Sequence, residues 1–218
     1  MRRAFDLSLY LVLDPVLCGG FDGMVSTAFT SVRAGATVVQ LRAPGWKKRD
    51  LVNCARALKK TLAPFSIPLI IDDDADVCLA ADADGLHVGQ RDLEIHDARA
   101  IIGPDRILGL SISNLEELAG ADPVVSDYLG VGPIFATSTK PDAAPAMGYD
   151  GLAAVTTATM LPTVAIGGIK AQHAADIIRA GADGIAVVSA ICGQADPAQA
   201  TAGLKSLVDV ALSKRNAR

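Results

Sequence analysis

The chain has 218 residues, of which 50% are hydrophobic, 20% are charged and only 4% are aromatic. This length suits one domain of α/β-barrel size, and its core must consist mainly of aliphatic side chains. The formal net charge of -4 argues against bulk nucleic-acid binding. No apolar stretch reaches membrane-spanning length without charged residues.

The N-terminal apolar run contains two aspartates and no small-residue cleavage site, so we expect a first strand there rather than a signal peptide. A single domain should cover residues 1–218, with frayed ends at Met1–Asp6 and Lys214–Arg218. The four cysteines form no C-x-x-C pair, and the three histidines complete no zinc spacing. We therefore expect reduced thiols and a cytoplasmic protein.

Eight short apolar runs rich in valine, isoleucine and leucine recur along the chain. They are Leu9–Leu13, Thr37–Leu41, Pro68–Ile71, Gly85–Val88, Ile107–Leu110, Tyr128–Val131, Thr163–Ile166 and Gly184–Val188. Each is too short for a helix, and most lack the alternation of a half-exposed strand, which is typical of buried parallel strands. Alanine-rich segments with helical spacing lie between them, such as Leu51–Leu62, Ala171–Ala180 and Pro197–Leu212.

Strands that alternate with helices, without a linker rich in proline, glycine or serine, predict a single (β/α)8 TIM barrel. Similar phrases at 34–42, 81–89 and 180–188 each join a helix end to a strand through a turn. An open doubly wound sheet would predict G-x-G-x-x-G after the first strand. The sequence there, DPVLCGGFDG, does not fit that pattern.

Polar residues follow the predicted strands, at the barrel end where TIM-barrel active sites lie. Asp73 and Asp92 come from adjacent strands and can therefore meet at one Mg²⁺, which prefers one or two carboxylates plus water and phosphate. Arg42 and Lys140 suit an anionic group. The glycine pair after the seventh strand and the residues after the eighth predict a phosphate cup of backbone N–H groups.

Some neighbouring residues have ordinary structural explanations. We expect Asp74 and Asp76 to form a solvated turn, with Asp76 as a helix cap. His87 lies inside the fourth predicted strand, and we expect it to face the core or the barrel interior. No single residue therefore indicates a function. The evidence for an active site is strong only when the polar residues at consecutive strand ends are taken together.

These residues resemble the thiamine phosphate synthase family. The resemblance runs in order from about Tyr10 to Ile191, in VVQLR, IIDDDAD, ADGLHVGQRDL, YLGVGPIFATSTK, VAIGGI and GADGIAVVSAI. It implies a Mg²⁺-dependent (β/α)8 transferase that joins 4-amino-2-methyl-5-pyrimidinylmethyl diphosphate (HMP-PP) to thiazole phosphate, giving thiamine phosphate and pyrophosphate. The implied mechanism is dissociative and needs no side-chain nucleophile.

The resemblance also implies a role for each matching residue. Arg42, Lys140 and Ser111 are the implied catalytic residues, and Asp73 and Asp92 are the implied ligands of one Mg²⁺. The residues implied on the pyrimidine side are Gln40, Arg42, Ala43, Pro44, Asp72, Ser111 and Lys140. Those implied to bind the thiazole phosphate are Thr137, Ser138, Thr139, Gly168, Val188 and Ser189.

Two places depart from the usual family pattern. Ala43 and Pro44 stand where the family usually has an acid and a lysine, and Asp72 stands where it usually has asparagine. The first change removes a positive charge, and the second can add a negative charge beside a polyanion. We hypothesise that Lys47 or Lys48 supplies the missing cation, and that Asp72 pairs with a substrate amine or holds a proton.

Two other functions stay open on the sequence alone. A thiazole tautomerase from a related barrel group would bind thiazole phosphate without coupling it, although it would not need Lys140 or the metal-position aspartates. A non-catalytic binder of thiazole phosphate or thiamine phosphate would show no turnover and little dependence on Mg²⁺. In each case the partners are small molecules, without nucleic acid or membrane, and assembly into a homo-oligomer stays open.

Overall fold

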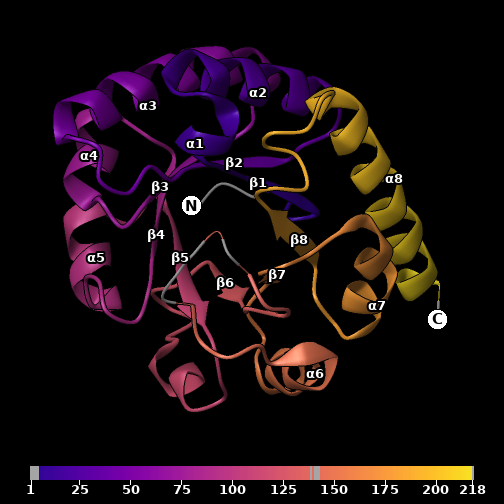
Figure 1. The fold of residues 1–218 in the computed structure, drawn as a ribbon. Coiled ribbons are helices and arrows are strands. Elements are labelled where there is room, and N and C mark those ends of the chain that lie inside the picture. The colour runs from indigo at the N-terminus through magenta and orange to yellow at the C-terminus, as the bar shows by residue number, and fades with distance from the viewer. Residues whose placement is uncertain (1–4, 138, 140–142, 218) are drawn as a thin grey trace.

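The computed structural model describes residues 5–137, 139 and 143–217. Eight parallel strands close into a barrel in chain order, and β1 pairs with β8 to complete the ring (Figure 1). The strands are β1 (Leu9–Leu13), β2 (Val38–Leu41), β3 (Leu69–Asp72), β4 (Gly85–Val88), β5 (Ile107–Ile112), β6 (Tyr128–Val131), β7 (Thr163–Ile166) and β8 (Gly184–Val187). The predicted (β/α)8 barrel and its strand positions are confirmed.

The helices lie outside the barrel (Figure 1). The α-helices are α1 (Pro15–Cys18), α2 (Phe21–Arg33), α3 (Lys48–Leu62), α4 (Ala75–Ala80), α5 (Ile95–Ile102), α6 (Gly148–Ala158), α7 (Ala174–Arg179) and α8 (Pro197–Asn216). The 3-10 helices are η1 (Ala63–Phe65), η2 (Glu117–Gly120) and η3 (Ala171–His173). Only η2 connects β5 to β6, because Gly120 and Pro123 disfavour a longer helix there. Among the described helices, none has the length and apolarity needed to cross a bilayer.

The described residues near both ends of the chain contact the barrel. Helix α8 continues to Asn216, and the fraying expected from Lys214 stays a prediction. Arg215 ties this part of the helix to the turn before β8, because its guanidinium donates to the Ala182 carbonyl at 2.7 Å and lies 3.0 Å from a carboxylate oxygen of Asp183. At the other end, the Phe5 ring packs edge to face against a buried tyrosine, with ring centroids 5.7 Å apart.

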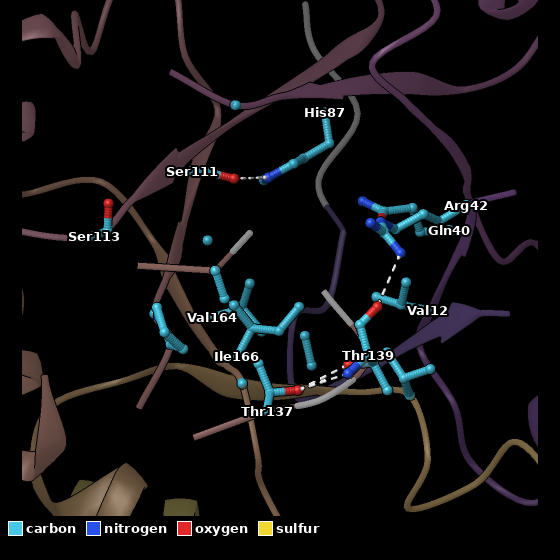
Figure 2. A pocket seen from close by; sticks show the side chains of 18 of the residues that line it. Val12, Gln40, Arg42, His87, Ser111, Ser113, Thr137, Thr139, Val164 and Ile166 are labelled. Carbon is cyan, nitrogen blue, oxygen red and sulfur yellow. Dashed lines mark hydrogen bonds between the residues drawn. The ribbon is translucent and has the colours of Figure 1, made fainter. Parts of the chain in front are cut away.

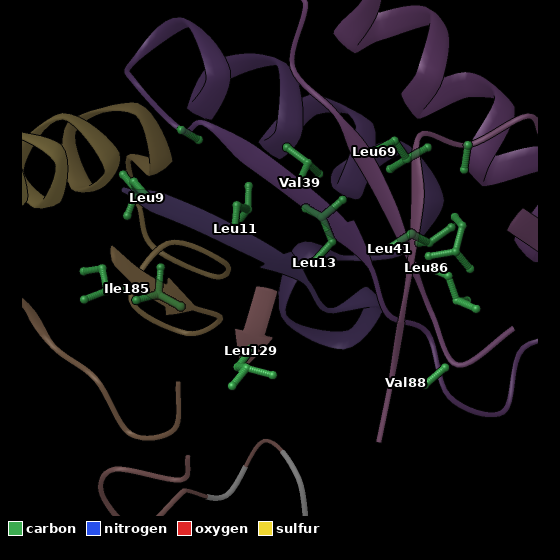
Figure 3. Close-up of a cluster of buried hydrophobic side chains, with 14 of the residues drawn as sticks. Leu9, Leu11, Leu13, Val39, Leu41, Leu69, Leu86, Val88, Leu129 and Ile185 are labelled. Atoms are coloured by element: carbon green, nitrogen blue, oxygen red, sulfur yellow. The ribbon is translucent and has the colours of Figure 1, made fainter. Parts of the chain in front are cut away.

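Side chains along the strands alternate between an outer, mainly aliphatic core and an inner cluster that includes two tyrosines. Leu9, Leu11 and Leu13 face the surrounding helices and belong to the outer core (Figure 3). Tyr10 and Val12 belong to the inner cluster, with Leu7, Val38, Ile70, Ile107, Tyr128, Val164 and Ala186. Because both faces of the strands are buried, they appear in the sequence as nearly continuous apolar runs.

Candidate active site

A cavity of about 390 Å³ lies within the barrel and extends to the residues that follow the strands. The predicted site residues that line it are Gln40, Arg42, Asp72, Ser111, Thr137, Thr139, Gly168, Val188 and Ser189. Their inward orientation follows from the two-residue repeat of the strands: Val38 and Gln40 point inward along β2, whereas Val39 and Leu41 point toward the helices.

The other predicted site residues do not appear in the described lining. Ala43 is buried and Pro44 is exposed just beyond β2. Asp73 and Asp92 are exposed beyond β3 and β4. The remaining two, Ser138 and Lys140, lie outside the described residues. The roles of these six stay predictions, as do the roles of the nine residues that line the cavity.

Arg42 and Asp72 form an ion pair at the mouth of the cavity. Nε of Arg42 lies 3.2 Å from Oδ2 of Asp72, and the two side chains are only 22% and 17% exposed. Nη1 of Arg42 also lies 3.5 Å from the carbonyl oxygen of Thr139 (Figure 2). These contacts hold the guanidinium through Nε and Nη1 and leave further N–H donors for an anion. One partner of Asp72 is thus an arginine of the protein itself.

Lys48 lies among acids rather than beside the cavity lining. Its ammonium group pairs with Asp74, and it lies 3.0 Å from Oδ1 of Asp76. The hydrogen bond from Lys48 lowers the pKa of Asp76 below its ordinary value. Asp74 occupies the N-cap position of α4, so the expectation of Asp76 as the cap is wrong. Since Lys48 is held by two carboxylates, it does not stand in for the missing family lysine in this structure.

Asp73 and Asp92 fit the chemistry of a magnesium site. The backbone N–H of Asp73 donates to the His87 carbonyl at 2.8 Å, which ties the end of β3 to β4. Oδ2 of Asp92 accepts a hydrogen bond of 2.9 Å from the Gly89 N–H in the next loop. The described residues contain no group of three or more His, Cys, Asp or Glu able to form a protein-only site. Two carboxylates at adjacent strand ends suit Mg²⁺, which completes its shell with water and phosphate.

The turn after β7 requires glycine at two consecutive positions. Gly167 and Gly168 have φ of 98° and 63°, which L side chains rarely adopt. A Cβ on Gly168 would also lie 2.6 Å from the Ala136 carbonyl oxygen. Close by, the hydroxyl oxygens of Thr137 and Thr139 are 2.9 Å apart (Figure 2). Hydroxyls and backbone N–H groups of this kind can bind a phosphate.

A hydrogen-bonded chain crosses the barrel interior below the cavity mouth. Nε2 of Gln40 donates to the Tyr10 hydroxyl at 3.0 Å, and that hydroxyl lies 2.9 Å from the Tyr128 hydroxyl. Nδ1 of His87 lies 2.9 Å from the Tyr128 hydroxyl, and its Nε2 lies 2.9 Å from Oγ of Ser111 (Figure 2 shows this last bond). The predicted interior position of His87 is confirmed. Neither tyrosine is among the predicted site residues, although each occupies an inward position of its strand.

A TIM barrel that gathers an arginine, carboxylates and a glycine turn around one cavity is typical of enzymes that act on phosphorylated small molecules. Residues 9–191 match the family model described as thiamine monophosphate synthase. The chain therefore belongs to this family.

Similar proteins support the assignment along nearly the whole chain. A thiamine-phosphate synthase of Laribacter hongkongensis is 51% identical over 207 residues, which are 95% of this chain and 98% of that protein. Another, of Xanthobacter autotrophicus, is 55% identical over 208 residues, with coverage of 95% and 98%. The solved structure of a thiamine phosphate pyrophosphorylase from Pyrococcus furiosus superposes with a TM-score of 0.85 at 33% identity, covering 94% of this chain and 97% of that one. The names of these relatives favour a synthase over a thiazole tautomerase or a non-catalytic binding protein.

Proposed function

We propose that the protein couples HMP-PP to thiazole phosphate with one Mg²⁺, releasing pyrophosphate and forming thiamine phosphate. The observation that carries the proposal is the presence of two anion-binding regions on one cavity. Arg42, oriented by Asp72, serves the diphosphate, and the glycine turn at Gly167 and Gly168 serves the second phosphate. The names of the relatives support the same reaction.

In this mechanism the exocyclic C–O bond of HMP-PP breaks, and its electron pair leaves with pyrophosphate. The guanidinium of Arg42 stabilises the negative charge that develops on the leaving oxygen. The thiazole nitrogen then attacks the pyrimidine carbocation and forms the new C–N bond. Val164 and Ala186, which line the cavity and are buried, help to exclude water that would otherwise capture the cation.

Asp73 and Asp92 are the proposed ligands of Mg²⁺. When bound, the ion supplies positive charge against the diphosphate. Lys140 is the proposed second cation on the pyrimidine side, whereas Ser138 joins Thr137 and Thr139 around the thiazole phosphate. These last hydroxyls, with the backbone N–H groups of the turns, align the thiazole nitrogen for attack.

The remaining proposals concern the surroundings of the site. Ala43 and Pro44 are proposed to shape the loop beside the diphosphate, where proline stiffens the backbone. All four cysteines are free thiols, which supports the proposed cytoplasmic location.

Binding and turnover in two arginine variants test the proposed division of the cavity. Arg42→Ala removes charge-assisted hydrogen bonds, so we expect about 10- to 100-fold weaker pyrophosphate binding by calorimetry. Thiazole phosphate affinity should stay unchanged, and thiamine phosphate formation should fall at least as strongly as pyrophosphate binding. Arg49→Ala, at an exposed position of α3, is the matched control and should change neither value. Equal pyrophosphate affinities in the two variants would contradict the proposal.

A further inference from the structure

Four consecutive hydrogen bonds form the interior chain, which joins Gln40, Tyr10, Tyr128, His87 and Ser111. The proposed reaction assigns no role to the three middle residues. On the basis of the proposed function, we infer that its hydrogen bonds run in one direction, from Gln40 to Ser111. This direction fixes His87 as the neutral tautomer protonated on Nε2 and leaves the Ser111 hydroxyl hydrogen pointing toward the substrate. Tyr10, Tyr128 and His87 are therefore positioning residues that act through Ser111.

The direction begins at Gln40. Its Nε2 can only donate, and it lies 3.0 Å from the Tyr10 hydroxyl, so the Tyr10 oxygen is an acceptor in this contact. The hydrogen of Tyr10 then needs an acceptor of its own, and the Tyr128 oxygen lies 2.9 Å away. In the opposite direction Tyr10 would accept from both neighbours, and its buried hydroxyl hydrogen would have no acceptor among the described residues, which is unfavourable.

The chain of hydrogen bonds continues from Tyr128 through His87 to the cavity. Once Tyr128 accepts from Tyr10, its own hydrogen is directed to Nδ1 of His87, at 2.9 Å. An imidazole that accepts on Nδ1 in its neutral form is protonated on Nε2, which donates to Oγ of Ser111 at 2.9 Å. The Ser111 hydrogen must then point away from His87. Both residues line the cavity, so this hydrogen is available to an anionic oxygen of the diphosphate.

Two glycines hold the rings in the positions that this direction requires. A Cβ at Gly109 would lie 2.2 Å from Cζ of Tyr128 and 2.4 Å from Nδ1 of His87. A Cβ at Gly130 would lie 2.9 Å from Cε1 of His87. The rings therefore fill the space that inward side chains of β5 and β6 would occupy. Burial also raises the pKa of the Tyr10 and Tyr128 hydroxyls above the usual value, so both keep their hydrogens at neutral pH.

Long-range ¹H–¹⁵N NMR spectra of the unliganded protein test the tautomer directly. His96→Gln and His173→Gln variants assign the His87 signals, because the chain has three histidines. We expect a protonated Nε2 and an unprotonated Nδ1 in the unmodified protein. Gln40→Glu replaces the donor with a carboxylate that can only accept, so it should reverse the chain and move the hydrogen to Nδ1. A wild-type Nδ1–H tautomer, or an identical tautomer in Gln40→Glu, would overturn the inference.

Kinetics test whether the direction matters for turnover. Tyr128→Phe removes the donor to His87, and we expect kcat to fall about three- to tenfold, as for one lost hydrogen bond, with a small change in KM. Tyr149→Phe, in α6 and outside the described cavity lining, is the matched control. Equal kcat values and equal His87 tautomers in the two variants would refute the inference. If wild-type protein forms no thiamine phosphate, the proposed function fails, and the tautomer spectra still decide the direction of the chain.

Discussion

Alanine at Gly109 tests how tightly the barrel interior is packed around the active site. The new Cβ would lie 2.2 Å from Cζ of Tyr128, whereas unstrained carbon atoms lie about 3.5–4.0 Å apart. One of the two groups must therefore shift by more than about 1 Å. Tyr128 is 0% exposed, and its hydroxyl has hydrogen-bond contacts with Tyr10 and His87. A shift of this ring consequently disrupts the interior chain as well as the packing.

The expected cost follows from these two effects. Overpacking of a dense core costs about 1–3 kcal/mol, and one lost buried hydrogen bond adds about 1 kcal/mol. We therefore expect the free energy of unfolding of Gly109→Ala to fall by about 3 kcal/mol. In a chain of this size 1 kcal/mol corresponds to about 2–4 °C, so the Tm should fall by about 6–12 °C.

Thermal unfolding followed by circular dichroism measures this difference. Gly203→Ala is the matched control, because a Cβ there meets no atom within 4 Å and the residue lies within α8. Alanine favours a helix over glycine by about 0.5–1 kcal/mol, so the Tm of this control should rise slightly. A Tm of Gly109→Ala within about 2 °C of wild type would refute the packing argument, because it corresponds to a loss of less than about 1 kcal/mol in the free energy of unfolding.

Further predictions concern charge and thiol chemistry. Asp73→Asn should raise the Mg²⁺ concentration for half-maximal activity at least about tenfold, whereas Asp76→Asn should not. The same half-maximal Mg²⁺ concentration in the two variants would contradict the assignment of Asp73 as a metal ligand. The hydrogen bond from Cys192 lowers the pKa of Cys18 to about 7, so iodoacetamide labelling followed by mass spectrometry should show a rate that rises through about pH 7. A midpoint near 8.5, as in an ordinary thiol, would contradict this. Pro44→Lys should strengthen pyrophosphate binding about three- to tenfold by calorimetry; unchanged affinity would indicate another compensating cation.

The barrel could be predicted from the sequence because its signal is local. Each strand is a short aliphatic run buried on both faces, and each run ends where polar residues begin. The helix after β5 could not be predicted in the same way, since the barrel pattern suggests one and only local breakers such as Gly120 limit it to η2. The helical end around Arg215 likewise depends on Asp183, a partner distant in the sequence.

A site residue could be predicted from the sequence only where its position on a strand decides whether its side chain points into the barrel. Gln40 and Ser111 lie on inward positions and line the cavity as expected. The pairing of Tyr10 with Tyr128 joins residues 118 positions apart, and no local pattern indicates it. The partners of Lys48 could not be predicted from the sequence either. Its long flexible side chain can reach either the cavity or the carboxylates of Asp74 and Asp76, and only the fold decides between them.

Thiamine phosphate formation is the most direct test of the central claim. Purified protein would be incubated with HMP-PP and thiazole phosphate, with Mg²⁺ or with EDTA, and the product quantified by chromatography. We predict thiamine phosphate and an equal amount of pyrophosphate with Mg²⁺, and neither product with EDTA. Folded protein that binds thiazole phosphate but forms no thiamine phosphate with Mg²⁺ would contradict the proposed coupling reaction.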